Sequence, residues 1–457
     1  MYKLSKYNIC LPLEDPDKKW LLLNGCSGAF RIISQQVAQT LMLAEKDFRA
    51  IHSLDIPTLD LLRDAGCLIG VDSDEEKTID RICQKIHQHS VNDLNVTFIP
   101  SYVCNFQCPY CFERSIKTEK PGWYQGKMTA DLVDGIFKAL DDLLAQGKRV
   151  CSFTLFGGEP LLPQNKEIIG IILEKCRAYH APILAVTNGY HLDEYVNLLK
   201  DYPIDTLKIT IDGTRDIHDQ RRAPANGKSF DRIMRNVITA LEQGIAVSLR
   251  TNINKENIAC IDGLKAYYEA CRLTKFPKFS YYFKATMACF EPEDNAVSDL
   301  QIMDIVGNDC SHYCRNSAFN RIYVPLRKML SGETATCFKA EYCGAHSGNL
   351  VFDPYGNIFS CWDVLTDPRS VIGKVNTETG RFVFNENYHI WQNRTVSTIP
   401  FCKNCKYKLF CGGGCAAQGL VVNDDMNKPF CEAFIQRFNQ VAIKTATDLL
   451  TSNNIRR

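Results

Sequence analysis

The chain lacks the long apolar run that a membrane-spanning helix needs. No segment approaches the roughly 20 apolar residues that cross a bilayer, and the first residues, Met1 to Tyr7, contain no apolar signal segment. The chain also lacks an excess of charge, because its 457 residues carry a formal net charge of +1. This leaves no basic footprint for nucleic acid or for an acidic membrane surface. We therefore expect a cytoplasmic protein that binds neither nucleic acid nor membrane.

Cysteine, in contrast, is abundant. The sequence contains 22 cysteines, and in a reducing cytoplasm they favour metal ligation over a disulfide scaffold. Three of them, Cys104, Cys108 and Cys111, have the spacing C-x3-C-x2-C. Cysteine thiolates usually hold every iron of a [4Fe–4S] cluster, so three thiolates leave one iron open for a ligand. The spacing predicts a reactive iron–sulfur cluster, with a zinc knuckle as the alternative.

This triplet, with the aromatic Tyr110 just before its last cysteine, resembles the radical S-adenosylmethionine (radical SAM) enzymes. In that family the amino and carboxylate groups of SAM chelate the open iron. An electron from the cluster then cleaves SAM to methionine and a 5′-deoxyadenosyl radical, which abstracts a hydrogen atom. By this resemblance, Tyr110 belongs to the SAM site.

Two further stretches carry the same resemblance. Residues 156–160 read FGGEP and match the family's GGEP motif, in which the backbone and the Glu contact the SAM amino group; here these are Gly157, Gly158 and Glu159. The string from 211 to 244, which begins IDGTRDIHDQRR, is similar to peptide- and protein-modifying members. The resemblance puts Thr210 and Asp212 near the SAM ribose or carboxylate, although both would also suit a plain strand-end turn. Arg250 is a candidate partner of the SAM carboxylate or a structural arginine.

The region from about 94 to 285 alternates strand and helix patterns, which predicts parallel strands joined by right-handed crossovers. The resemblance implies an α/β fold, the open partial (β/α)6 TIM barrel of the radical SAM family. The active site of such a barrel lies at the C-terminal ends of its strands, where the cysteine triplet falls. Strands are expected over 94–99, 150–156, 182–186, 206–211, 246–251 and 278–283, and helices over 130–146, 166–177, 192–200, 230–243 and 255–270.

Eight cysteines near the end of the chain form a second pattern, which resembles the iron–sulfur SPASM domain. Carried over from that family, two sets of four ligands would hold two auxiliary [4Fe–4S] clusters; two zinc sites are the alternative. Cys310 and Cys314 form a further C-x3-C pair with no assigned role. The first auxiliary set is Cys337, Cys343, Cys361 and Cys415, and the second is Cys402, Cys405, Cys411 and Cys431.

Residues 1–90 read as a small module of three strands (7–13, 19–23, 29–33) followed by three helices (35–43, 57–66, 75–87), with Ser34 as the cap of the first helix. This order suggests a winged-helix-like module. It resembles the RiPP recognition element (RRE), which captures the leader of a ribosomally made precursor peptide as an added strand. A cap that only covers the barrel and a DNA-binding winged helix are the alternatives.

We therefore expect three domains: an RRE-like domain at 1–90, a radical SAM core at 91–330 and a SPASM domain at 331–457. The expected function is modification of a ribosomally synthesised precursor peptide by a crosslink. A thioether C–S bond is the favoured crosslink, and a C–C bond is the alternative. A flavodoxin- or ferredoxin-type protein would donate electrons. Glu113 and Asp363 are candidate proton acceptors by position. The peptide, the linked residues and the oligomeric state stay open.

Three other functions stay in view. Anaerobic sulfatase-maturating enzymes resemble the chain at all three cluster sites, but they carry a catalytic Asp directly after the third auxiliary cysteine. Here that position holds Trp362, and Asp363 follows it. A peptide epimerase needs no net oxidation of its substrate. A non-enzymatic electron carrier or peptide-binding regulator would not need the GGEP motif or an open iron.

Overall fold

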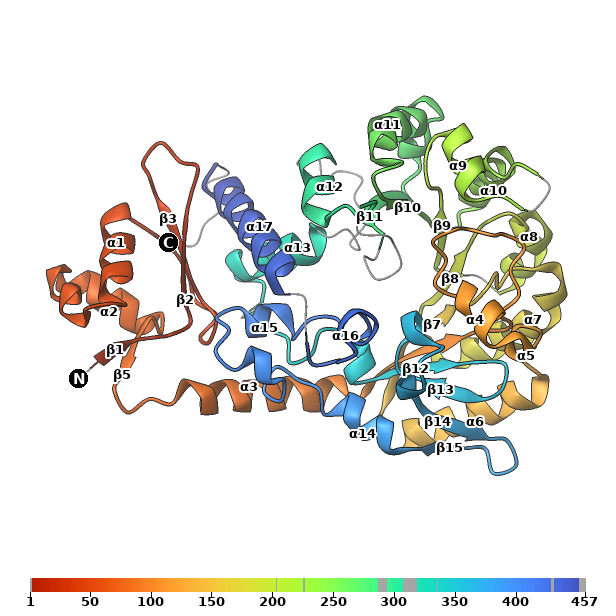
Figure 1. The fold of residues 1–457 in the computed structure, drawn as a ribbon, viewed down its shortest axis with the longest axis horizontal. Coiled ribbons are helices and arrows are strands. Elements are labelled where there is room, and N and C mark those ends of the chain that lie inside the picture. Colours follow the sequence, from red (N-terminus) through yellow and green to blue (C-terminus); the bar gives the residue numbers. More distant parts are fainter. Residues whose placement is uncertain are drawn as a thin grey trace. The chain divides into compact units, whose positions relative to one another are not determined.

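The computed structural model describes residues 2–202, 204–224, 227–286, 294–306, 319–334, 336–428 and 431–451 (Figure 1). The chain divides into two compact units. Unit 1 contains Met1–Gln88, Phe319–Cys343 and Arg394–Arg457, and unit 2 contains His89–Ala318 and Gly344–Asn393. Cys310 and Cys314 lie outside the described residues. In the described part of the chain, no helix combines the length and apolar character that crossing a bilayer requires.

Unit 2 is built on one large sheet. Its first six strands run parallel, and all six predicted strands are present with ends shifted by at most two residues. Four more strands continue the sheet beyond β6, where β12 pairs parallel with β6 and β13 to β15 follow as antiparallel neighbours. In sheet order the strands are β11 (Phe279–Ala285), β10 (Val247–Ile253), β9 (Thr206–Thr210), β8 (Ile183–Thr187), β7 (Arg149–Leu155), β6 (Asp93–Phe98), β12 (Asn349–Phe352), β13 (Asn357–Phe359), β14 (Val371–Asn376) and β15 (Arg381–Phe384).

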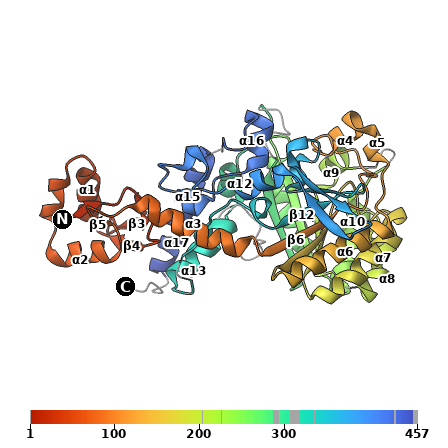
Figure 2. The ribbon, with the colours of Figure 1, turned by 90° about the horizontal axis from the view of Figure 1, so that it is seen from below.

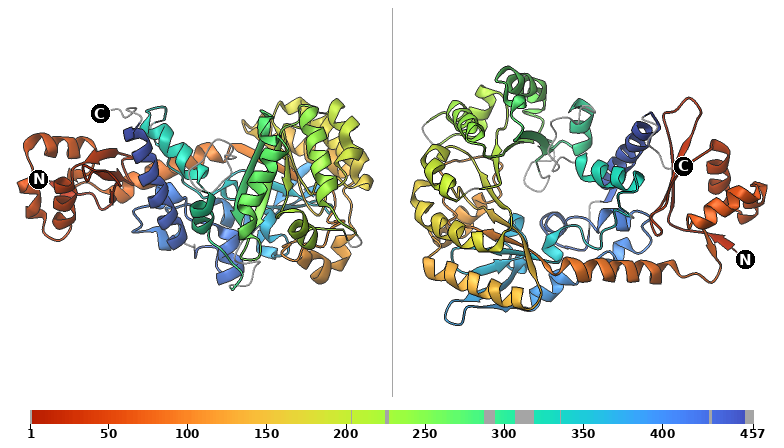
Figure 3. Two further views of the ribbon diagram at one scale, coloured as in Figure 1. Left: turned by 90° about the horizontal axis from the view of Figure 1, so that it is seen from above. Right: turned by 180° about the vertical axis from the view of Figure 1, so that it is seen from behind.

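Helices cover the outer side of this curved sheet (Figure 3). Helix α6 shows why they do so: Thr129 caps its first turn, and its apolar residues recur every three or four positions to give one buried face. These crossovers place the C-terminal ends of the parallel strands along one edge. The crossover helices are α6 (Ala130–Ala145), α7 (Lys166–Cys176), α8 (Leu192–Asp201), α10 (Phe230–Glu242) and α11 (Ile261–Ala270), and shorter ones are α4 (Arg114–Glu119), α5 (Pro121–Tyr124), α9 (Arg215–Arg221), α12 (Asp299–Val306) and α14 (Glu386–Gln392).

One predicted helix begins later than expected. The pattern over 255–270 suggested continuous helix, but the regular helix starts only at Ile261, after a 3₁₀ turn at Ile258–Cys260. The cause is Asn257, whose side chain accepts from the Asn254 backbone N–H (2.8 Å) and donates to the Asp212 carbonyl (2.7 Å). These bonds hold the segment as a loop at the strand end, and they compete with helix formation.

Unit 1 contains the predicted N-terminal module. Strands β2 (Asn8–Pro12), β3 (Trp20–Asn24) and β4 (Phe30–Ile33) form an antiparallel sheet. Helix α1 (Gln35–Ala44) follows with Ser34 as its cap, as predicted, because the Ser34 side chain accepts from the Val37 N–H. Helices α2 (Ile56–Asp64) and α3 (Glu75–Ser90) complete the order, and a small unpredicted pair, β1 (Tyr2–Leu4) with β5 (Leu68–Gly70), joins its ends.

The N-terminal module shares a core with the cysteine-rich segment of unit 1. Tyr7, Ile79 and Cys83 of the module are buried in one cluster with Ala340, Val396 and Leu409. In the same unit, helices α13 (Asn320–Leu330) and α17 (Cys431–Thr451) pack against each other (Figure 2). The unit also contains the short helices α15 (Lys408–Cys411) and α16 (Ala416–Asn423). The two compact units therefore group residues differently from the division at 90 and 330, and the three-domain division stays a prediction.

Candidate functional site

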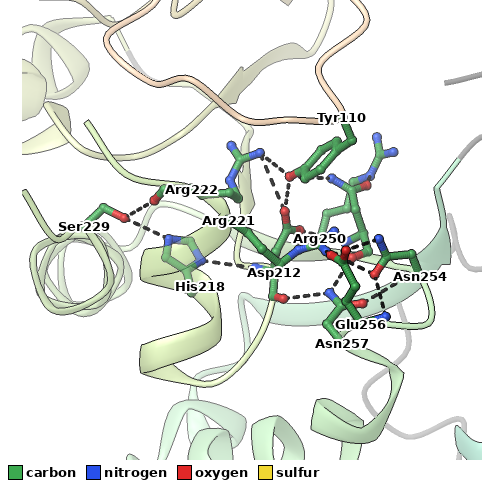
Figure 4. Close-up of polar contacts among 11 residues, drawn as sticks. Tyr110, Asp212, His218, Arg221, Arg222, Ser229, Arg250, Asn254, Glu256 and Asn257 are labelled. Atoms are coloured by element: carbon green, nitrogen blue, oxygen red, sulfur yellow. Dashed lines mark hydrogen bonds and ion pairs between the residues drawn. The ribbon is translucent and has the colours of Figure 1, made fainter. Parts of the chain in front are cut away.

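A polar network lies at the C-terminal ends of β9 and β10 (Figure 4). Asp212, two residues beyond the end of β9, is fully buried. Its carboxylate accepts a hydrogen bond from the Tyr110 hydroxyl and one from the Asn252 backbone N–H at 2.9 Å. Burial raises the pKa of Asp212, while the nearby guanidinium of Arg222, 3.9 Å away, opposes that rise. Tyr110 of the cysteine loop is thereby tied to the strand ends, as the predicted common site requires.

Two neighbouring arginines bring unsatisfied donors to this network. Arg222 donates from Nη1 to the Tyr110 hydroxyl (2.6 Å), and Arg221 lies over the Tyr110 ring, 5.2 Å from its centre. Within the described part of the chain, the buried Nε of Arg222 and the buried Nε and Nη2 of Arg221 find no acceptor. Electrostatic attraction to the thiols of the cysteine triplet and to Asp212 raises the pKa of Arg222, although burial opposes it. Buried donors without acceptors indicate an absent anionic or polar ligand.

His218 fixes the turn that carries these groups. Its Nδ1 accepts from the Asp212 backbone N–H at 3.1 Å, and its Nε2 lies 3.0 Å from the Ser229 hydroxyl. Because a backbone N–H can only donate, Nδ1 is unprotonated and Nε2 donates. Ser229 in turn donates to the Arg222 carbonyl. Burial, with a smaller contribution from the charge of Arg222, lowers the pKa of His218 to about 3, so the ring is neutral.

The cysteine triplet lies in the loop after β6. The Phe106 backbone N–H points at the Cys104 sulfur (3.4 Å), and the Cys111 N–H donates to the Cys108 carbonyl (3.2 Å). Burial raises the pKa of all three thiols, that of Cys111 to about 12, so a positive metal group is needed to hold them as thiolates. Among the described residues, no group of three or more His, Cys, Asp or Glu side chains converges on one metal ion; the thiolates of a cube bind separate irons instead.

The FGGEP stretch places this loop against the sheet. A Cβ on Gly158 would lie 2.4 Å from the carbonyl oxygens of Tyr102 and Val103, so only glycine allows this approach. Glu159 is 1% exposed, and its carboxylate accepts from the Leu161 and Asn188 backbone N–H groups and from the Thr187 hydroxyl. A carboxylate has about four acceptor sites. Three of them are used here, two by Thr187 and Asn188 at the end of β8 and one by the nearby Leu161, which leaves Glu159 little remaining capacity for a SAM ammonium.

Thr210 and Arg250 lie opposite each other in neighbouring strands. Thr210 ends β9, and Arg250 of β10 is its parallel partner in the register. The Arg250 Nε donates to the Asn252 side chain at 2.7 Å. Both residues therefore border the same strand-end network as Asp212, and their contact with SAM stays a prediction.

Glu113 lies close enough to Asp363, 250 residues later in the chain, for the charge of Asp363 to affect it. Burial, and the charges of Asp363 and Glu159, raise the pKa of Glu113 to about 8, and its buried Oε1 has no hydrogen-bond partner among the described residues. Burial also raises the pKa of Asp363, which Lys284 and Arg250 oppose. Next to Asp363, the Trp362 ring stacks on Phe156 with 4.8 Å between ring centres. The two carboxyl groups predicted by position thus influence each other electrostatically, and their role in the site stays a prediction.

Comparison with known proteins identifies the domain that these residues form. Residues 98–266 match the model of the radical SAM superfamily, and this range contains the triplet, the FGGEP stretch and the Asp212 network. These residues form a radical SAM domain. The chain is an enzyme of radical SAM type, as the motifs predicted, and such a domain works with a [4Fe–4S] cluster and SAM.

Relatives of the radical SAM domain extend the comparison over most of the chain. A cysteine-type anaerobic sulfatase-maturating enzyme of Clostridium novyi is 25% identical over 359 residues, 74% of this chain and 92% of that protein. Native anSMEcpe, solved with bound AdoMet and the Kp18Cys peptide, has a TM-score of 0.58 at 19% identity, with 79% of this chain and 100% of that chain covered. Streptococcus suis SuiB, solved with its precursor peptide SuiA, has a TM-score of 0.52 at 13% identity, with 95% and 99% covered.

The eight cysteines beyond the radical SAM domain fall in both units. Cys361 follows β13 in unit 2, and the other seven lie in unit 1. Gly412, Gly413 and Gly414, between Cys411 and Cys415, all have positive φ. Only glycine adopts this conformation readily, so the triple glycine permits a sharp turn between two cysteines assigned to different clusters. The assignment of the ligands stays a prediction.

Sequence reasoning about the radical SAM domain did not assign a role to His218, Arg221, Arg222 or Asn257. The signal was present, because the string HDQRR follows a strand end that carries Asp212. A single sequence does not show, however, which of its polar residues turn inward. The burial of all four identifies them as part of the site.

Proposed function

We propose that this radical SAM enzyme modifies a ribosomally synthesised precursor peptide and installs a crosslink. The favoured crosslink is a thioether C–S bond, and a C–C bond is the alternative. The observation that carries the proposal is the extent of the likeness to SuiB, which was solved with a precursor peptide. A match over 95% of the chain must include most of residues 1–88. This coverage supports an N-terminal module like that of a protein solved with such a peptide.

The residues at the strand ends fit the cluster and SAM. Cys104, Cys108 and Cys111 would hold three irons of the cluster, and the unsatisfied donors of Arg221 and Arg222 suit the carboxylate of SAM. When bound, the cluster and SAM supply the 5′-deoxyadenosyl radical that takes a hydrogen atom from the peptide. Gly157 and Gly158 let the backbone approach, and the neutral His218 keeps Asp212 and Arg222 in place.

The remaining site residues belong to the peptide side of this proposal. The stacked rings of Phe156 and Trp362 give the site an apolar wall beside Glu113 and Asp363. A peptide thiol or amide that enters a crosslink loses a proton, and these two carboxyl groups are the candidates to accept it by position. Hydrogen abstraction itself depends on positioning more than on acid–base chemistry.

The N-terminal sheet would capture the leader of the peptide. In the order β2-β3-β4, the outer strands β2 and β4 each have one paired neighbour among the described strands. An unpaired strand edge offers backbone N–H and C=O groups to an added strand. This arrangement supports leader binding by β-strand addition, as the RRE resemblance predicts.

Two auxiliary [4Fe–4S] clusters complete the proposal. A crosslink replaces two hydrogen atoms by one new bond and is therefore a two-electron oxidation of the peptide. Hydrogen abstraction removes the first electron with its proton, and an auxiliary cluster would accept the second. A flavodoxin- or ferredoxin-type donor would supply the electron that SAM cleavage consumes.

Formylglycine formation is the second candidate, because the Clostridium novyi relative is named a cysteine-type anaerobic sulfatase-maturating enzyme. The residue after Cys361 argues against it. Trp362 occupies that position and packs on Phe156, and the carboxyl group comes one residue later at Asp363.

Mass spectrometry of the cognate peptide tests the function. The full chain is co-expressed with that peptide under anaerobic conditions, and the peptide is analysed with and without the chain. Loss of two hydrogen atoms supports crosslinking, and loss of the cysteine sulfur supports formylglycine instead. An unchanged mass with altered stereochemistry would show epimerisation and refute the crosslink.

A further inference from the structure

Arg394 holds the turn between two auxiliary cysteines of unit 1. Its side chain is 3% exposed, and each of its three nitrogens donates to a backbone carbonyl. Nη2 donates to Gly413 (2.9 Å), Nη1 to Gly414 (3.1 Å) and Nε to Met426 (2.9 Å). Glycines 413 and 414 lie between Cys411 and Cys415. The planar fork of one buried arginine thus fixes the backbone that sets the separation of these two cysteines.

The same guanidinium brings a positive charge to the cysteines. Its strongest electrostatic partners are the thiols of Cys402, Cys415, Cys343 and Cys411. Lys339 adds a second cation close to Cys411, Cys337 and Cys343, and its backbone N–H donates to the Leu409 carbonyl at 2.7 Å. Buried arginines are usually paired with carboxylates. Here the groups with the largest electrostatic effect on the arginine are thiols, which become negative when they bind iron.

We propose that Arg394 is a positioning residue that holds the Cys411–Cys415 turn and raises the reduction potential of at least one of the two auxiliary clusters to which its neighbouring cysteines are assigned. The inference rests on the proposed function, because it assumes that these cysteines hold iron–sulfur clusters. A reduced cluster carries one more negative charge than the oxidised cluster, so a nearby buried cation favours the reduced form. A raised potential suits a cluster that accepts an electron from the peptide.

The test compares Arg394→Gln, which removes the charge and the fork, with Arg394→Lys, which keeps the charge. Arg49→Gln removes an exposed arginine of the same unit and is the matched control. Each full-length protein is reconstituted anaerobically. Iron content is measured, and EPR-monitored titration gives the midpoint potentials of the signals that do not change when SAM is added.

In Arg394→Gln, we expect the ratio of reduced to oxidised cluster at a fixed potential to fall about tenfold for one auxiliary cluster, a shift of about 59 mV for a one-electron couple. Arg394→Lys should stay near the wild type, and Arg49→Gln should match it. Full iron with an unchanged potential in Arg394→Gln would overturn the inference. If Arg394→Gln cannot hold iron, the positioning role is supported, and Arg394→Lys decides the electrostatic role. A wild-type potential in the iron that Arg394→Lys retains supports the inference, and a lowered potential overturns it.

The wild-type protein separates this inference from the proposed function. Three clusters correspond to about twelve irons per chain. About four irons would refute the auxiliary clusters themselves, before any Arg394 variant is considered. About twelve irons with no response to Arg394→Gln would refute only the role of Arg394.

Discussion

Replacement of His218 by glutamine should flatten the pH dependence of stability in the radical SAM domain. In the folded protein, burial lowers the pKa of His218 to about 3, against 6.5 for the unperturbed side chain. As pH falls below 6.5, His218 takes up a proton in the unfolded chain but stays neutral in the folded protein. The stability that this residue contributes is therefore fully present above pH 6.5 and is lost as pH falls toward 3. The slope is about 1.4 kcal/mol per pH unit, so the wild type should lose about 1.4 kcal/mol between pH 7.5 and 5.5 through this residue.

The assay is urea unfolding at both pH values for the wild type, His218→Gln and His52→Gln, a control at an exposed histidine of unit 1. Comparing differences between variants cancels the contributions of other titrating groups. His218→Gln should lack the 1.4 kcal/mol loss, and His52→Gln should retain it. Parallel pH profiles of the wild type and His218→Gln would refute the neutral, buried histidine. A second variant, His218→Phe, should lower the free energy of unfolding by about 1–3 kcal/mol at pH 7.5, because the buried Asp212 N–H loses its acceptor.

Two further predictions concern the packing around the sites. Glu76→Gln should lower the urea-unfolding free energy of unit 1 by about 2–4 kcal/mol, because the buried Lys408 ammonium loses the carboxylate 2.8 Å away. Glu45→Gln, at an exposed ion pair, should cost less than about 1 kcal/mol. Equal losses in the two variants would contradict the larger contribution of the buried pair. Gly158→Ala should abolish SAM-dependent formation of 5′-deoxyadenosine, because its Cβ would lie 2.4 Å from two backbone oxygens. Gly170→Ala inside α7 meets only the Leu198 side chain, at an ordinary contact distance of 3.6 Å, and should be neutral or stabilising by about 0.5 kcal/mol. Full activity in Gly158→Ala would refute the close approach.

Local patterns were enough to predict much of the fold. Apolar runs flanked by turn residues located the six parallel strands, and Ser34 before an amphipathic run located the cap of α1. The site was predictable where a motif lies at a strand end. The cysteine triplet, the FGGEP stretch and Asp212 each follow a strand, so a parallel sheet brings them to one edge.

Long-range pairing was not predictable from one sequence. Strands β12 to β15 are short and lie in a segment rich in cysteines and turn residues, and β12 finds its partner β6 about 250 residues earlier in the chain. Neither periodicity nor turn chemistry encodes such a distant partner. The same limit applies to Arg394, whose three acceptors lie 19 to 32 residues away. The role of Arg394 depends on tertiary contacts that no local sequence pattern predicts.

The central claim is that Cys104, Cys108 and Cys111 leave one iron of their cluster open to SAM. The direct measurement is EPR of the anaerobically reconstituted and reduced full chain before and after SAM is added, with metal analysis of the same sample. The account predicts that one cluster signal changes with SAM, that 5′-deoxyadenosine forms, and that both effects vanish when the three cysteines are replaced by alanine. Signals that ignore SAM in fully loaded protein, or zinc in place of iron, would contradict it.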